Sequence, residues 1–154
     1  MKTEDLKELE KENLEKLIVF ASRGIKKKIN KLIETNQYNV TFEEYLTIVN
    51  ILNFKGIYQS ELAQRIDKDR HATSRIVDTL IKKDLIYKES DLNDTRKFKI
   101  YPTDFCRKSI IPKEFDKQLS ESVFANIDNE KVQELKSIVV AIINNVTTEI
   151  NDEE

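Results

Sequence analysis

Glycine and proline are scarce in this sequence, with two of each among 154 residues. Because these residues are the main signals for turns and chain breaks, their scarcity predicts long helices joined by few connections. There is also one cysteine, Cys106, and one histidine. A single cysteine excludes an internal disulfide, in keeping with a reducing cytoplasm. One cysteine and one histidine also cannot build a nitrogen and sulfur metal site within one chain.

Long hydrophobic runs are missing as well. The longest apolar runs, such as residues 138–143, are far too short to span a bilayer. Residues 1–13 carry charges of both signs and no apolar segment, so they do not resemble a secretory signal peptide. With 39% hydrophobic and 35% charged residues, we expect a soluble, cytoplasmic protein in which residues 1–154 form a single domain.

The charge is unevenly distributed along the chain, although the net charge is only −2. Residues 55–101 contain eleven Lys and Arg against eight Asp and Glu, whereas residues 128–154 contain two against seven. The basic excess lies in the middle, as expected for a nucleic-acid-binding segment. An ordinary scatter of surface charges explains this distribution equally well, so charge alone does not decide the function.

Helical periodicity dominates the first half of the sequence. Apolar residues recur at spacings of three and four over residues 5–35, which predicts one long first helix. Thr41 and Glu44 have the spacing of a capping box, so a second helix should follow and end near residues 53–56. A short third helix is expected at residues 59–66.

A fourth helix should follow at residues 70–83, because Asp69 is a suitable N-cap. The period then changes to that of strands at residues 85–89 and 98–101, with a polar hairpin loop between them. Thr103 can cap a fifth helix.

We expect Pro112 to bend this fifth helix, and Asp128 can cap a sixth. The predicted fold is therefore mainly α with a small antiparallel β-hairpin. Residues 41–103 form a winged helix-turn-helix region. The helices of residues 1–36 and 104–150 carry more apolar positions than one such region needs to cover, which favours a dimerisation role.

The fourth helix has a polar face suited to the major groove of DNA. Arg70, His71, Ser74 and Arg75 lie at positions i, i+1, i+4 and i+5, so all four can face the same stretch of groove. Arg96 and Lys97, at the base of the hairpin, can reach the minor groove or the backbone. Each of these residues taken alone could equally be a solvated surface residue; their joint position carries the prediction.

These segments resemble the MarR family of bacterial regulators. Residues 59–66 are similar to the first helix of its helix-turn-helix, and residues 69–80 to its recognition helix. Leu85 and Ile86 fall where its first wing strand begins, and Asp94-Thr95-Arg96 followed by Thr103 is similar to its wing signature. Residues 41–45 also resemble the SarA-type branch of the same superfamily.

The resemblance implies a homodimer whose first, fifth and sixth helices interlock. Such a protein would be a transcriptional regulator, a repressor on a pseudo-palindromic operator in double-stranded DNA. It further implies that Asp94 pairs with Arg96 to shape the wing. The sequence departs from the family pattern at four positions: Tyr58 replaces a Thr helix cap, Asp84 a Gly, Thr95 an Arg of the wing tip, and Pro102 a Leu.

Many relatives lose DNA affinity when they bind a small aromatic effector. Four aromatic residues of this chain could line an effector cleft, although packing in the core explains each of them too: Phe20, Tyr38, Phe42 and Tyr45. Relatives also respond to cysteine oxidation, and Arg107 could activate Cys106. No cofactor is expected.

The main alternative function is a winged-helix protein-interaction module that does not bind DNA. An enzyme is not expected, because the sequence has no Gly-rich phosphate loop, no His-based acid–base pair and no metal cluster.

Overall fold

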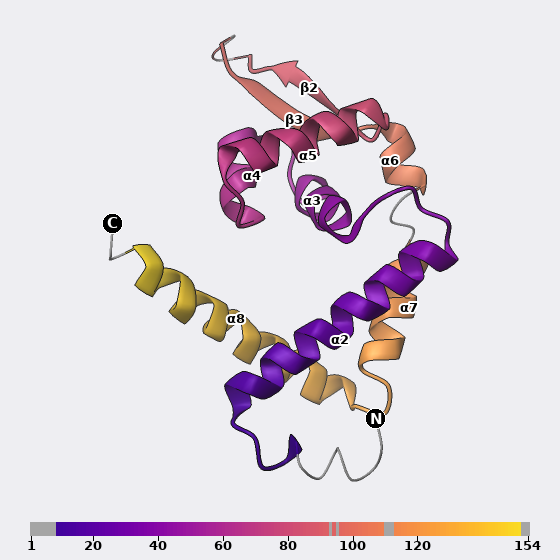
Figure 1. The fold of residues 1–154 in the computed structure, drawn as a ribbon, viewed down its shortest axis with the longest axis vertical. Coiled ribbons are helices and arrows are strands. Elements are labelled where there is room, and N and C mark those ends of the chain that lie inside the picture. Colours follow the sequence, from indigo (N-terminus) through magenta and orange to yellow (C-terminus); the bar gives the residue numbers. More distant parts are fainter. Residues whose placement is uncertain (1–8, 93, 95, 110–112, 152–154) are drawn as a thin grey trace. The chain divides into compact units, whose positions relative to one another are not determined.

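The computed structural model describes residues 9–92, 94, 96–109 and 113–151 (Figure 1). The chain divides into two compact units, Met1–Leu119 and Ser120–Glu154. The first unit contains all of the helix-turn-helix and sheet elements, and the second contains the whole of the long helix α8 (Asn129–Asn151). No helix within the described residues is both long and apolar enough to cross a membrane.

The first long helix begins later than the sequence predicts. Helix α2 runs over Leu14–Thr35 instead of starting near residue 5, and residues 10–13 are not helical. The reason is a local N-cap, since the side chain of Asn13 accepts a hydrogen bond from the backbone N–H of Lys16 at 3.4 Å. Near its other end, α2 packs against the core through the buried Ile29 and Ile33.

The predicted helix-turn-helix is confirmed almost to the residue. Its helices are α3 (Phe42–Leu52), α4 (Gln59–Arg65) and α5 (Arg70–Lys82). The capping box of α3 is complete, because Thr41 Oγ1 accepts the Glu44 amide at 3.2 Å and Glu44 Oε2 accepts the Thr41 amide at 2.7 Å. Asp69 caps α5 by accepting the Ala72 amide at 2.8 Å.

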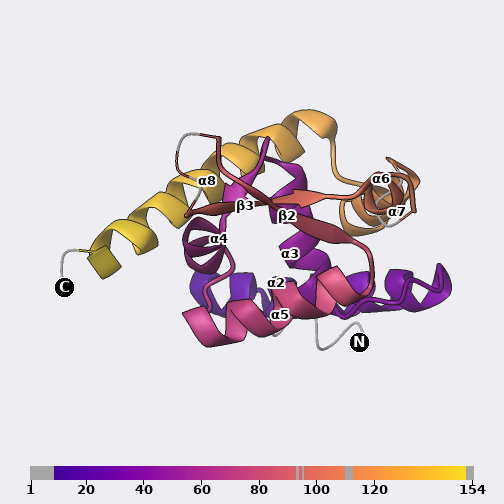
Figure 2. The same ribbon diagram turned by 90° about the horizontal axis from the view of Figure 1, so that it is seen from above.

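A three-stranded antiparallel sheet forms the wing and its base. Strands β2 (Ile86–Ser90) and β3 (Phe98–Pro102) make the predicted hairpin, which Figures 1 and 2 show beside α5. A third strand, β1 (Ile57–Tyr58), was not predicted, and it gives the order β1-β3-β2. Two residues are too few to show an alternating pattern, so only their pairing with Ile100 and Lys99 identifies this strand.

Helix ends are closed without glycine. Gln37, Asp67 and Asp84 follow α2, α4 and α5 in the left-handed region, with φ of 56°, 50° and 57°. After α5, the Leu85 amide donates to the Leu80 carbonyl at 3.0 Å, which is the wide hydrogen bond of a Schellman motif. Asp84 therefore does adopt the conformation for which the family uses Gly, and Asp tolerates it better than most residues.

Three helices follow the wing: α6 (Asp104–Ser109), α7 (Lys113–Val123) and α8 (Asn129–Asn151). Thr103 caps α6 as predicted, its Oγ1 accepting the Cys106 amide at 3.0 Å. Pro112, the expected bend, lies outside the described residues. Helix α8 begins after Asp128, also as predicted.

The core of the first unit lies between the helix-turn-helix, the sheet and α2. Its fully buried apolar side chains come from helices α3, α4 and α5 and from all three strands: Ile48, Ile51, Leu62, Val77, Leu80, Ile57, Ile86 and Ile100. Phe115 of α7 joins them. Because α5 contributes two of these side chains, its inner face is fixed and its outer face must meet the solvent.

Candidate nucleic-acid interface

Helix α5 presents a polar outer face over a buried inner face. Thr73, Val77 and Leu80 are buried, whereas Arg70, His71 and Arg75 are exposed and Ser74 is half-buried. The structure thus places the predicted polar residues on the solvent side of the helix. Their side chains can approach a ligand as large as a DNA duplex without disturbing the core.

The N-terminus of α5 is held by Asp69, whose pKa is lowered. The main cause is the hydrogen bond from the Ala72 amide, and the backbone amide of His71 and the positive charge of Arg75 act in the same direction. The carboxylate therefore stays ionised at neutral pH and keeps the first turn of α5 in place. This turn carries Arg70 and His71.

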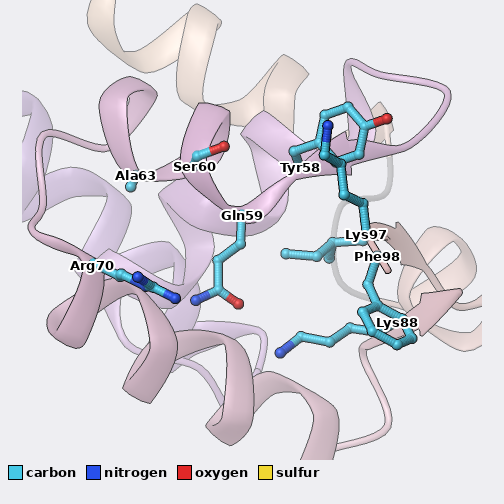
Figure 3. A pocket seen from close by; sticks show the side chains of 9 residues that line it. Tyr58, Gln59, Ser60, Ala63, Arg70, Lys88, Lys97 and Phe98 are labelled. Atoms are coloured by element: carbon cyan, nitrogen blue, oxygen red, sulfur yellow. The ribbon is translucent and has the colours of Figure 1, made fainter. Parts of the chain in front are cut away.

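A groove of about 620 Å³ runs between the start of α4, the start of α5 and the sheet (Figure 3). Arg70, Gln59 and Lys88 point into it from α5, α4 and β2, respectively. The residues that line the groove are Tyr58, Gln59, Ser60, Ala63, Arg70, Lys88, Lys97, Phe98 and Ile100. Two cationic groups and an amide side chain therefore converge on one open channel, an arrangement that suits an anion such as a backbone phosphate.

Two groove residues, Lys88 and Gln59, were not predicted from the sequence. Lys88 pairs with Ile100 across the hairpin, so both side chains lie on the sheet face that lines the groove. Side chains alternate between the two faces of a strand, so the buried Ile86 could have shown that Lys88, two residues later, lies on the same face of β2. Gln59 has no such signal, because its place depends on where α4 packs.

Several cations on α5 and in the groove have no ion-pair partner among the described residues. Arg70, Arg75 and Lys88 make no salt bridge with any residue in the part of the chain that the structure describes. Other lysines are paired, namely Lys68 with Glu43, Lys83 with Glu44 and Lys99 with Asp91. Among the cations that line the groove, Arg70 and Lys88 therefore have no ion-pair partner within the described residues, whereas Lys97 lies near Asp94.

In the wing, Asp94 shapes the loop chiefly through backbone groups. Its Oδ1 accepts the backbone amide of Arg96 at 3.2 Å, and its carbonyl accepts the Lys97 amide at 2.9 Å. The pairing of Asp94 with Arg96 therefore involves the amide of Arg96, while the ammonium of Lys97 lies 3.6 Å from Asp94 Oδ2. Arg96 and Lys97 are both exposed, and Lys97 also lines the groove. Thr95 lies outside the described residues.

The four aromatic residues of the expected effector cleft occupy different surroundings. Tyr45 is buried, and its ring centroid lies 5.0 Å from that of Phe115. Tyr38 also packs near Phe115, at 6.0 Å, whereas Phe42 lies under the ammonium of Lys26 and Phe20 is exposed on α2. Packing in the core is therefore sufficient to explain the position of Tyr45 without an effector.

Cys106 is buried, and burial raises the pKa of its thiol to about 11. The neighbouring Arg107 acts in the opposite direction but more weakly. The thiolate needed for oxidation is therefore scarce at neutral pH. Among the described residues, no three His, Cys, Asp or Glu side chains gather where a metal ion could bind.

Part of the chain is similar to a known protein family. Residues 38–97 match the model of the MarR family. No curated protein sequence matches the chain significantly. The family resemblance predicted from the sequence is thus confirmed for the segment that holds α3, α4, α5 and most of the wing.

Solved structures match over nearly the whole chain. A MarR transcriptional regulator from Methanosarcina mazei Go1 is 20% identical, with a TM-score of 0.75 over 88% of this chain and 96% of that one. The transcriptional regulator SlyA is also 20% identical, with a TM-score of 0.78 over 93% and 100%. S. aureus MepR in its DNA complex is 19% identical, with a TM-score of 0.71 over 88% and 99%. The predicted winged-helix fold is confirmed.

Proposed function

We propose that this chain, whose residues 38–97 are a MarR-family winged helix-turn-helix, is a cytoplasmic, sequence-specific DNA-binding transcriptional regulator. The observation that carries the proposal is the set of cations without internal partners: Arg75 on the outer face of α5, and Arg70 and Lys88 in the groove beside it. Counterion release makes such cations the main source of affinity for DNA.

In this proposal α5 enters the major groove and the wing lies along the neighbouring backbone. Arg75 and His71 contact bases, with Ser74 beside them. Arg70, Lys88 and Lys97 contact phosphates, since they approach the groove from α5, β2 and the wing loop. MepR, a protein of the same fold, has been solved in complex with DNA, which supports this mode of action.

The proposed assembly is a homodimer on a pseudo-palindromic operator, where it acts as a repressor. Helix α2 leaves Leu14, Ile18, Val19 and Phe20 exposed in the single chain. Helix α8 leaves a longer apolar set exposed, consisting of Leu135, Ile138, Val139, Val140, Ile143 and Val146. Burying two such helices against a second copy removes a large apolar area from water, and a two-fold dimer places two α5 helices about one DNA turn apart.

Fluorescence anisotropy with DNA from upstream of the protein's own gene tests the proposal, with random DNA as the control. We expect tight binding that prefers the upstream DNA, and Arg75→Ala should weaken it by roughly 1–3 kcal/mol. Equal affinity for both DNAs would reject sequence specificity. No binding at low salt would reject the DNA-binding role and favour the protein-interaction module. Adding small aromatic compounds to the same assay tests release by an effector.

A further inference from the structure

Asp91 is a buried carboxylate at the start of the wing loop. Its side chain is 2% exposed, although its neighbours Ser90 and Leu92 are both exposed. It accepts a hydrogen bond from the hydroxyl of Tyr58, and the ammonium of Lys99 lies 2.8 Å from the same Oδ2 atom. A buried carboxylate is stable only with partners of this kind, so the three residues form a fixed cluster.

The sheet register explains why these residues meet. Tyr58 of β1 lies directly opposite Lys99 of β3, and the Lys99 ammonium lies 5.1 Å from the centroid of the Tyr58 ring. Glu89 of β2 lies opposite Lys99 on its other side. Asp91 follows two residues later, so it is a diagonal neighbour of Lys99 on the same face of the sheet.

The cluster joins the wing loop to the start of α4. Tyr58 is the N-cap residue of α4 and immediately precedes Gln59, which lines the groove. Asp91 donates its backbone amide to the Lys97 carbonyl at 2.9 Å, which closes the base of the wing loop. The contact from Tyr58 to Asp91 therefore fixes the wing loop, with Arg96 and Lys97, relative to the first turn of α4.

We propose that Tyr58, Asp91 and Lys99 are positioning residues that hold the wing at the angle needed for its cations to reach DNA together with α5. The role rests on the proposed DNA-binding function. This role explains why Tyr58 stands where the resembling family has a Thr helix cap, because the shorter Thr side chain could not reach Asp91 across the sheet. The hydrogen bond to Asp91 also raises the pKa of Tyr58, so the hydroxyl keeps its proton at physiological pH.

Limited trypsin digestion tests the anchoring of the wing without DNA. Tyr58→Phe removes one hydroxyl and keeps the ring, and Tyr87→Phe removes an exposed hydroxyl from β2 of the same sheet as the matched control. We expect cleavage after Arg96 and Lys97 to be several-fold faster in Tyr58→Phe and unchanged in Tyr87→Phe. Equal cleavage in wild type and Tyr58→Phe would overturn the anchoring. Asp91→Asn provides a second variant, and thermal unfolding verifies that each variant folds.

A double-mutant cycle tests the effect on DNA binding. We expect Tyr58→Phe to weaken DNA binding about five-fold in the wild-type background. In an Arg96→Ala/Lys97→Ala background the loss should be less than about two-fold, because the wing loop then lacks the two cations that the cluster positions. A purely structural role would give the same loss in both backgrounds, and that result would overturn the inference.

The outcomes separate this inference from the proposed function. If the wild type binds no DNA, the proposed function fails, and so does the positioning role. If the wild type binds and Tyr58→Phe binds equally well, the inference fails while the function stands. If Arg96→Ala/Lys97→Ala binds as tightly as the wild type, the wing does not contribute, and the inference fails again.

Discussion

The ammonium of Lys83 lies 2.8 Å from one carboxylate oxygen of Glu44 and 2.9 Å from the other, joining the end of α5 to the first turn of α3. Glu44 is nearly buried and also accepts the Thr41 amide in the capping box of α3. One carboxylate therefore fixes both the start of α3 and the end of the proposed recognition helix. Such a pair is costly to break, because it leaves a charge without a partner in a poorly solvated site.

Replacing Lys83 with alanine should lower the free energy of unfolding by about 2 kcal/mol. The value is below that of a fully buried pair, because the Lys83 side chain is 24% exposed. The matched control is Lys68→Ala, which breaks an exposed ion pair with Glu43 and should cost less than about 1 kcal/mol. Urea denaturation measures both values, and equal losses in the two variants would contradict the structural role of Glu44.

The two glycines should respond in opposite ways to alanine. Gly56 has φ of 95°, and a Cβ atom there would lie 2.6 Å from ring atoms of Tyr101, so Gly56→Ala should destabilise by about 1–3 kcal/mol. Gly24 lies within α2 with open space around it, so Gly24→Ala should stabilise by up to about 1 kcal/mol. Thermal unfolding compares the two variants. A destabilising Gly24→Ala would show that α2 packs more closely there than the structure describes.

The thiol of Cys106 should be unreactive in the folded protein. Its pKa of about 11 leaves roughly a hundred-fold less thiolate at pH 8 than an ordinary cysteine has. A disulfide reagent with a coloured product should therefore react slowly until the protein is unfolded. Rapid reaction in the native state would contradict the burial of Cys106 and reopen its redox role.

The raised pKa of Cys106 also predicts how the stability of the folded protein changes with pH. The folded state favours the neutral thiol, so the thiol contributes to the free energy of unfolding, and this contribution is fully present below the ordinary cysteine pKa near 8.5. It is lost as pH rises toward 11. In urea denaturation, Cys106→Ser should show a smaller loss of stability than the wild type between these pH values.

The sequence predicted most elements because their signals are local. Capping residues such as Thr41 and Asp69 act within one turn, and the 3.6-residue period of α5 placed Arg70 and Arg75 outward. The start of α2 was mispredicted, because the apolar positions Leu6 and Leu9 were joined to those of α2 although residues 10–13 between them are all polar or charged. The Asn13 cap begins the helix at Leu14.

What the sequence could not predict depends on contacts between distant segments. Strand β1 has two residues and exists through its pairing with β3. Whether a cation is free or paired also depends on such contacts: Lys88 and Lys99 look alike in sequence, yet Lys99 is held by Asp91 and Lys88 points into the groove. The fold was therefore needed to place Gln59 in the candidate site and to show that Lys88 points into the groove without an ion-pair partner among the described residues.

The salt dependence of DNA binding tests the central claim most directly. The logarithm of the binding constant should fall linearly with the logarithm of the salt concentration, and Lys88→Ala should reduce the slope by about one per protomer bound. Lys68→Ala, which removes a cation paired with Glu43, should leave the slope unchanged. A wild-type slope near zero, or the same slope in Lys88→Ala, would contradict the proposal that the free cations of this face neutralise phosphates.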